Sequence, residues 1–298
     1  MSLPPGPNTP PLLLLIRWIL DPVTILREAF RKYGESFTLK LYRDAPFVLF
    51  THPAAIEELF ALGDEAVEVG APNDILRPTL GDNSLLLLDG DRHKRQRQLL
   101  MPAFHGERMR TYGELIAQLT EREIKTWTVG QPLTLRPAMQ RISLAVIIKT
   151  IFGIQESDRA QALQERTAAL LSLTTSPLGF ASAFFPILQR DWGRWSPGGN
   201  FLYLKQQVDE LIYAEIAAGR ANLDPHRTDV LSLMMTAVDD QGEGMGDEEL
   251  RDELMTLLLA GHETTATALS WALYWIYQDA DLLQRLRDEL APAPEDRP

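Results

Sequence analysis

A polar stretch interrupts the most apolar part of the chain. Between Leu257 and Trp271 the sequence reads LLLAGHETTATALSW, so a glycine, a histidine, an acid and two threonines stand inside an apolar segment. Gly261 permits close approach of something large to the backbone, although glycine in a helix interior costs about 1 kcal/mol relative to alanine. Glu263 and Thr264 offer a carboxylate and a hydroxyl that can organise a water molecule and transfer protons. The alternative is helix packing, with glycine at a helix crossing and threonines bonded to the backbone.

A basic segment upstream supplies a second group of candidate residues. In the run HKRQR, His93 and Arg97 stand four residues apart and share one face of the helix that the segment predicts. A cationic, hydrogen-bonding face of this kind suits two adjacent carboxylates. For Lys94 and Arg95 we expect a solvated basic surface, which contributes at most to docking an acidic partner protein.

The polar stretch must be positioned by a long helix. We expect this helix to begin at Asp247, which can cap it, and to extend to about Gln278. From Leu254 to Tyr277 it is apolar nearly all round, which is typical of a core rod or a membrane span. Because His262 and Glu263 would be costly near the middle of a span, we predict a core rod.

The rest of the chain predicts a mainly α fold with a small β-sheet near the N-terminus. A hairpin is expected from Ser36–Tyr42 and Phe47–Phe50, joined by a turn. Further helices are predicted at Asp21–Gly34, Pro53–Gly63, Asp91–Phe104, Gly106–Trp127, Met139–Gly153, Phe201–Gly219 and Thr228–Asp240, with a shorter charged helix after Gln278. Between Ser172 and Asn200 the periodicity breaks up. We predict one domain over residues 1–298.

Composition excludes several classes of function. The formal net charge is -12 over 298 residues, which argues against general nucleic-acid binding because that needs a basic face. The chain has no cysteine, so disulfides, zinc–thiolate sites and cysteine nucleophiles are excluded within it, and we assign no metal ligand. The apolar run Leu12–Leu20 is too short to span a bilayer and lacks the features of a secretory signal. We therefore expect a cytoplasmic protein, at most peripheral to a membrane.

Both candidate segments resemble motifs of the cytochrome P450 family. AGHETT, from Ala260 to Thr265, matches the pattern [AG]-G-x-[DE]-T-[TS] of that family's long central helix at every specified position. The basic segment, followed by LLMPAF, is similar to the family's helix beside the haem. The resemblance implies that Ala260, Gly261 and Thr264 line the oxygen side of haem b. It also implies that Glu263 and Thr264 handle protons, and that His93 and Arg97 bind the haem propionates.

The resemblance further implies an activity and its limits. Family members are monooxygenases that insert one oxygen atom into a lipophilic substrate, with electrons from a ferredoxin, flavodoxin or reductase. The irregular stretch around Ser172 to Trp195 falls where the family has its substrate lid. The family also needs an E-x-x-R pair and a cysteine loop after the long helix. The part of this sequence that follows the long helix has no E-x-x-R pair, and the sequence has no cysteine. We therefore expect a C-terminally truncated member of bacterial soluble type, inactive alone.

Two alternatives to the enzyme remain open from the sequence. One is a non-catalytic helical binding protein that keeps a lipophilic pocket or a loose haem pocket. The other is an unrelated helical interaction protein in which AGHETT is a packing feature.

Overall fold

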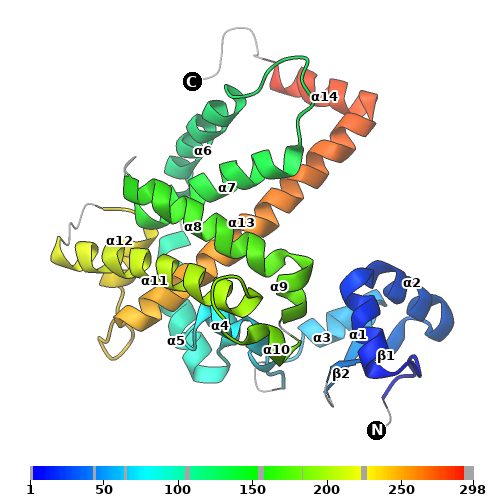
Figure 1. Cartoon of the computed structure of the whole chain (residues 1–298). Coiled ribbons are helices and arrows are strands. Elements are labelled where there is room, and N and C mark those ends of the chain that lie inside the picture. The colour runs from blue at the N-terminus through cyan, green and yellow to red at the C-terminus, as the bar shows by residue number, and fades with distance from the viewer. Residues whose placement is uncertain are drawn as a thin grey trace. The chain divides into compact units, whose positions relative to one another are not determined.

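The computed structural model describes residues 3–42, 45–63, 66–104, 108–153, 158–182, 184–222 and 227–291. These residues form a mainly helical protein with one two-stranded sheet (Figure 1), which confirms the predicted fold class. They group into two compact units. The first comprises Met1–Thr79, Leu86–Lys94 and Arg166–Asp209, and the second comprises Leu80–Leu85, Arg95–Glu165 and Glu210–Pro298. The single domain stays a prediction.

The first unit contains the predicted hairpin. Strand β1 (Ser36–Tyr42) pairs antiparallel with β2 (Ala45–Phe50), which begins two residues earlier than we expected. Strand alternation directs Phe37, Leu39 and Leu41 to one face of the sheet, where they are buried. This face packs with helices α1 (Pro11–Leu20) and α2 (Pro22–Tyr33) to form the core of the unit.

The ends of α2 follow from its terminal residues. The Asp21 carboxylate accepts a hydrogen bond of 3.1 Å from the backbone N–H of Thr24, and Pro22 occupies the first turn, where no N–H is needed. Gly34 ends the helix with a φ of 86°, a left-handed conformation that glycine adopts readily. The predicted helix between Asp21 and Gly34 is confirmed.

The other elements of the first unit are short. They are α3 (Pro53–Phe60), the 3₁₀ turn η1 (Ala71–Leu76), α9 (Pro177–Ser182) and α10 (Pro186–Gln189). Helix α3 ends three residues before the predicted Gly63. The irregular stretch from Ser172 to Asn200 contains the end of α8 (Asp158–Thr175), the short helices α9 and α10, and the start of α11 (Pro197–Ala221). The broken periodicity of the sequence indicated this interruption.

Several elements contain residues of both units. They are α4 (Arg77–Leu80), the turn η2 (Leu85–Leu87), α5 (Gly90–Leu100), α8 and α11. The predicted helix Asp91–Phe104 is α5 followed by the 3₁₀ turn η3 (Met101–Phe104). Helix α11 covers the predicted range Phe201–Gly219 and buries Val208, Ile212 and Ile216.

The second unit is centred on two long helices that pack together, α7 (Leu135–Phe152) and α13 (Asp247–Gln278). Ala138, Met139 and Ile142 of α7 form a buried cluster with Ala266 of α13. Helix α6 (Arg108–Ile124) lies against α7, and α14 (Ala280–Leu290) follows α13. Helix α12 (Val230–Thr236) is shorter than predicted.

Helix α13 has the predicted bounds but not the predicted cap or burial. Its N-cap is Gly246, whose N–H donates to the Glu249 carboxylate at 2.8 Å, so the prediction of Asp247 as the cap is wrong. The first half is buried. The second half exposes Trp271, Tyr274, Trp275 and Tyr277. Among the described residues, α13 is therefore a core helix in its first half and a surface helix in its second half. None of the helices in the described ranges has both the length and the apolar character that crossing a bilayer requires.

Candidate functional site

The predicted motif Ala260–Thr265 lies in the middle of α13 and has two different sides. Ala260 and Thr264 are four residues apart, share one face of the helix, and are exposed. His262 is buried, whereas Gly261 and Glu263 are half-buried. The motif is therefore open on the side of Ala260 and Thr264 and packed on the other.

Thr264 is bonded to the preceding turn of its own helix. Its hydroxyl donates a hydrogen bond to the carbonyl oxygen of Ala260. Such a bond competes with the regular backbone ladder and loosens the helix locally. A hydrogen bond from a threonine to the backbone is what the helix-packing alternative predicted for this motif. Because both groups lie on the exposed face, they can also exchange it for a bond to a bound water or ligand.

Gly261 marks the close approach of α13 to α7. A Cβ atom at this position would lie 2.8 Å from Cδ1 of Ile147. The buried hydroxyl of Ser143 lies 3.2 Å from the carbonyl oxygen of Gly261 and 3.1 Å from that of His262, and donates to both. Helix packing thus accounts for the glycine, and its predicted place beside a cofactor stays a prediction.

The Glu263 carboxylate is held by side chains of α7. Gln140 Nε2 donates to it at 2.8 Å and Arg136 Nη2 at 3.1 Å, and the side chain is 15% exposed. This supplies the partners that a largely buried carboxylate needs. The neighbouring His262 Nε2 lies 3.8 Å away, but burial lowers the pKa of His262 below its usual 6.5, so that contact is not an ion pair at pH 7.

The α7 residues that support the motif were not among the site residues predicted from the sequence. Arg136, Gln140, Ser143 and Ile147 stand at i, i+4, i+7 and i+11, so they form one stripe along α7. Each of the four meets Gly261, His262 or Glu263. The available signal was the helical spacing of three polar residues, Arg136, Gln140 and Ser143, along one face of α7.

His93 and Arg97 both lie on α5, at the predicted helical spacing. His93 is half-buried and Arg97 is exposed. His93 belongs to the first unit and Arg97 to the second, along one continuous helix. The structure brings Ala260, Gly261, Glu263 and Thr264 together on α13, but no described contact joins Arg97 to them.

Arg95 is a structural residue rather than part of a solvated surface. Its guanidinium donates to the Asp239 carboxylate at 2.7 Å, to Glu249 at 2.8 Å and to the carbonyl oxygen of Gly244 at 3.2 Å. The Arg95 hydrogen bond holds the pKa of Asp239 below its usual value. Arg95 therefore ties α5 to the acidic loop before α13 and to the first turn of α13, and the expectation of a solvated side chain is wrong here.

The residues present fit one side of a haem. The exposed face at Ala260 and Thr264 carries small side chains. The exposed Arg97 provides a guanidinium suited to carboxylates. The chain contains no cysteine and hence no thiolate for an iron. Among the residues that the structure describes, no group of three or more Asp, Glu or His side chains is placed to hold a metal ion.

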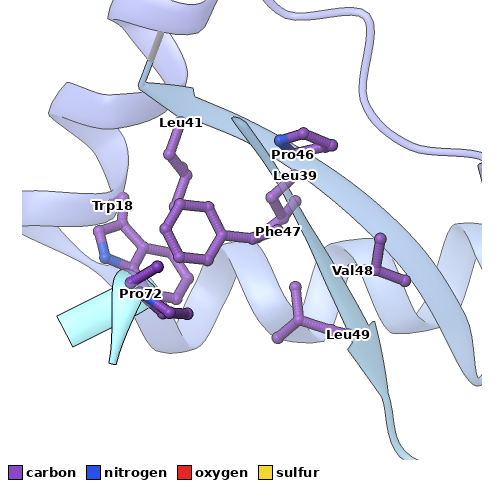
Figure 2. Close-up of a pocket in the computed structure, with 9 residues that line it drawn as sticks. Trp18, Leu39, Leu41, Pro46, Phe47, Val48, Leu49 and Pro72 are labelled. Carbon is purple, nitrogen blue, oxygen red and sulfur yellow. The ribbon is translucent and has the colours of Figure 1, made fainter. Parts of the chain in front are cut away.

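An apolar cavity of about 490 Å³ lies in the first unit (Figure 2). It is lined by Trp18 of α1, by Leu39, Leu41, Phe47 and Leu49 of the hairpin, and by Pro72. Its volume falls within the range of about 300–1,000 Å³ that is usual for small-molecule pockets. This cavity was not predicted from the sequence.

Comparison with known proteins places these features in context. The sequence profile of the family described as cytochrome P450 matches residues 4–297. The chain is 35% identical over 297 residues to putative cytochrome P450 135A1 of Mycobacterium tuberculosis. The aligned region covers 99% of this chain and 62% of the relative. It is 36% identical over 293 residues to putative cytochrome P450 138 of Mycobacterium bovis, with coverage of 97% and 64%.

A solved structure shares the fold. Retinoic acid-bound cyanobacterial CYP120A1 matches with a TM-score of 0.82 and 21% identity, over 97% of this chain and 64% of that chain. At this identity the match shows the arrangement of elements and not a shared ligand. The chain spans less than two-thirds of the length of the curated relatives described above.

Proposed function

Because this chain belongs to the cytochrome P450 family, we propose that it forms the oxygen-binding side of a haem-dependent monooxygenase that inserts one oxygen atom into a lipophilic substrate. Haem held by a thiolate supplies the activation and cleavage of dioxygen in such an enzyme. Family membership excludes the hypothesis of an unrelated helical interaction protein. The activity, substrate and partners remain proposals, since the chain spans only 62% of the first relative.

The one-sided exposure of the motif on α13 carries the proposal. Ala260 and Thr264 leave a small open surface on one face, while α7 packs against Gly261 on the other side. In our proposal Ala260 and Gly261 border the haem, and Thr264 presents its hydroxyl to the reacting side. The bond from Thr264 to Ala260 keeps that hydroxyl oriented until a ligand replaces the carbonyl acceptor.

Glu263 is proposed to hold protons for the site. Its carboxylate is fixed between Gln140 and Arg136, directly beside Thr264 in the sequence. Fixed position is what general acid–base work requires, because proton transfer depends on hydrogen-bond reach. Arg136 is largely exposed, so this end of the network reaches solvent, from which protons can be replaced.

His93 and Arg97 are proposed to bind the haem propionates. Arginine forms paired, charge-assisted hydrogen bonds with carboxylates, and a histidine four residues away on the same helix adds a second donor. The axial thiolate would have to come from polypeptide that is not among these 298 residues. An electron-donor protein such as a ferredoxin, flavodoxin or reductase would complete a cytoplasmic system.

Haem retention tests the proposal without requiring turnover. We would co-express this chain with the part of the Mycobacterium tuberculosis relative that lies beyond the matched length, purify the pair, and measure haem per protein. Arg97→Leu should lower haem retention by at least about ten-fold, because a charge-assisted pair is lost. Arg285→Leu, an exposed arginine on α14, is the matched control and should leave retention unchanged. Equal retention in both variants would contradict the assignment of Arg97.

A variant of Thr264 in the same co-expressed pair tests the role of its hydroxyl. Thr264→Val should leave haem retention intact but slow substrate oxidation, because the valine lacks the hydroxyl while keeping the shape. Thr265→Val, which changes the neighbouring exposed threonine on another face, is the control. If the two valine variants behaved alike, Thr264 would have no special role.

The alternative of a non-catalytic binding protein rests on two observations. The chain has no cysteine, and its first unit holds an apolar cavity of about 490 Å³. Under this alternative fatty acids would raise the melting temperature of the chain, and the co-expressed pair would show no turnover with any lipophilic substrate. Turnover by the pair would exclude it.

A further inference from the structure

The short segment Leu80–Leu85 is attached to the buried first half of α13. It runs from the last residue of α4 to the first residue of η2, and residues 81–84 form neither helix nor strand. The segment groups with the second unit, whereas the residues on both sides of it group with the first unit. Because no regular backbone ladder fixes residues 81–84, their position depends on their bonds to α13.

The Asp252 carboxylate of α13 holds the middle of this segment. Its Oδ2 accepts hydrogen bonds from the backbone N–H of Asn83 at 2.9 Å and from Asn83 Nδ2 at 3.0 Å. The Arg251 guanidinium donates to Asp252 Oδ1 at 2.9 Å and to the carbonyl oxygen of Leu80 at 2.8 Å. A Cβ atom at Gly81 would overlap the same carboxylate, so only glycine permits this approach. These contacts tie the segment to one turn of α13.

A pair of hydroxyls makes a further contact one turn along α13. The side-chain oxygens of Thr256 and Ser84 lie 2.7 Å apart, and both side chains are buried. Buried polar groups of α13 thus hold the segment like a strap. Such a network is stable only while each of its members is satisfied, because an unpaired polar group in the interior is costly.

The Glu253 carboxyl is the member of this network that lacks matched donors. Its side chain is fully buried beside Asp252, and neither oxygen makes a regular hydrogen bond among the described residues. Burial, together with the charges of Asp252 and Glu249, raises the pKa of Glu253 to about 8. The backbone N–H of Leu85, at the end of the segment, acts in the opposite direction. The closed network therefore favours the neutral acid.

The cations next to this cluster already have carboxylate partners. Arg251 is paired with Asp252 at 2.9 Å. Arg95 of α5 is paired with Glu249 at 2.8 Å. The charged residue of the segment itself, Asp82, is negative and exposed. Once ionised, the buried acid would stand among other carboxylates, and contact with water is what would stabilise its charge.

We propose that the segment Leu80–Leu85 is a latch on α13, which stays closed while Glu253 carries a proton and opens locally when that proton passes to water. Glu253, Ala260 and Thr264 stand at i, i+7 and i+11, so they share one face of α13. Opening therefore presents a hydrated carboxylate on the face that carries the exposed residues of the AGHETT motif. The latch requires neither haem nor turnover, so it stands or falls separately from the proposed function.

Hydrogen exchange of this chain alone tests the latch. Exchange in the peptide that covers residues 80–87, corrected for the intrinsic effect of pH on amide exchange, reports the equilibrium between closed and open segment. We expect opening to become more favourable by up to about ten-fold per pH unit between about pH 4.5 and 8, because one proton is released, and to level off above that range. Low concentrations of urea should leave this exchange unchanged, because local opening exposes little surface.

Three variants separate the proton from the other bonds of the latch. Glu253→Gln should keep the segment closed and abolish the pH dependence, because an amide does not ionise. Glu248→Gln, in the exposed first turn of α13, should retain the wild-type dependence. Asn83→Ala should raise opening about ten-fold at every pH without changing the slope, because one hydrogen bond to Asp252 is lost. All variants should keep the wild-type far-ultraviolet circular dichroism.

Three results would overturn the proposal. The first is a flat pH profile for residues 80–87 in the wild type, and the second is the wild-type slope in Glu253→Gln. The third is exchange of residues 80–87 that responds to urea as steeply as exchange in α7, which would mean that the segment opens only when the whole unit unfolds.

Discussion

Gln140 of α7 donates a hydrogen bond of 2.8 Å from Nε2 to the carboxylate of Glu263 in α13. Arg136 reaches the same carboxylate at 3.1 Å, but its side chain is 59% exposed. The half-buried amide therefore does more to fix the acid than the exposed cation, because water screens the ion pair. This bond joins the only carboxylate of the AGHETT motif to the rest of the second unit.

Removal of this amide should cost more than removal of the nearby charge. Gln140→Ala should lower the free energy of unfolding by about 1–2 kcal/mol, because a carboxylate with little solvent access loses a donor. Arg136→Gln should lower it by less than about 0.5 kcal/mol. Urea unfolding of both variants measures the difference. A larger effect from Arg136→Gln would show that the ion pair, and not the amide, holds Glu263.

The Ser143 hydroxyl should stabilise the crossing of α7 and α13. Because it donates to the carbonyl oxygens of Gly261 and His262 from a buried position, Ser143→Ala should cost about 1 kcal/mol. Ser270→Ala is the control, since the Ser270 hydroxyl donates to the carbonyl oxygen of Ala266 in its own helix. We expect little change there. Equal losses in the two variants would mean that the contact between helices contributes nothing.

The buried Glu253 should make stability depend on pH. Its side chain is fully buried, and neither oxygen makes a regular hydrogen bond among the described residues. Burial raises its pKa to about 8; the backbone N–H of Leu85 opposes the shift, and the charges of Asp252 and Glu249 add to it. Between about 4.5 and 8 the folded chain therefore binds more protons than the unfolded chain, so stability falls as pH rises through this window.

A glutamine at position 253 tests that pH dependence. Glu253→Gln should remove this fall and make the protein more stable than the wild type at pH 8, with little difference below pH 4.5. Thermal unfolding at a series of pH values gives the comparison. Glu248→Gln, in the exposed first turn of α13, should keep the wild-type profile. An unchanged pH profile for Glu253→Gln would show that the carboxyl is solvated.

Arg95 should hold the acidic loop against α5. Arg95→Leu removes hydrogen bonds to Asp239, Glu249 and Gly244, so we expect faster hydrogen exchange in the loop and a loss of about 1–2 kcal/mol. Arg95→Lys should recover part of this, because lysine keeps the charge but not the planar group of donors. The loop should also loosen in acid, as pH falls through the lowered pKa of Asp239. Unchanged exchange in Arg95→Leu would rule out this role.

Local signals predicted the elements well. The bounds of α13, the strand β1 and the helix between Asp21 and Gly34 followed from apolar periodicity and from end residues whose preferences are local. The cap of α13 was missed because glycine at Gly246 carries no side-chain signal. The partner that satisfies its N–H is Glu249, three residues later.

Tertiary partners were not predictable in the same way. The motif on α13 is visible in the sequence, but Gln140, Ser143 and Ile147 lie more than a hundred residues earlier, and only the packing of two helices brings them to it. The burial of individual residues in α1 was also not predictable, because a short apolar run does not indicate which of its residues the fold will bury.

The reduced carbon monoxide spectrum tests the central claim most directly. Haem would be added to this chain alone and to the chain co-expressed with the remaining part of the Mycobacterium tuberculosis relative, and each sample would be reduced and exposed to carbon monoxide. We predict the red-shifted Soret band of a thiolate-ligated haem for the pair and not for the chain alone, which has no cysteine. That band in the chain alone, or no haem bound by a folded pair, would contradict our account of Ala260 and Thr264 as one wall of a haem site.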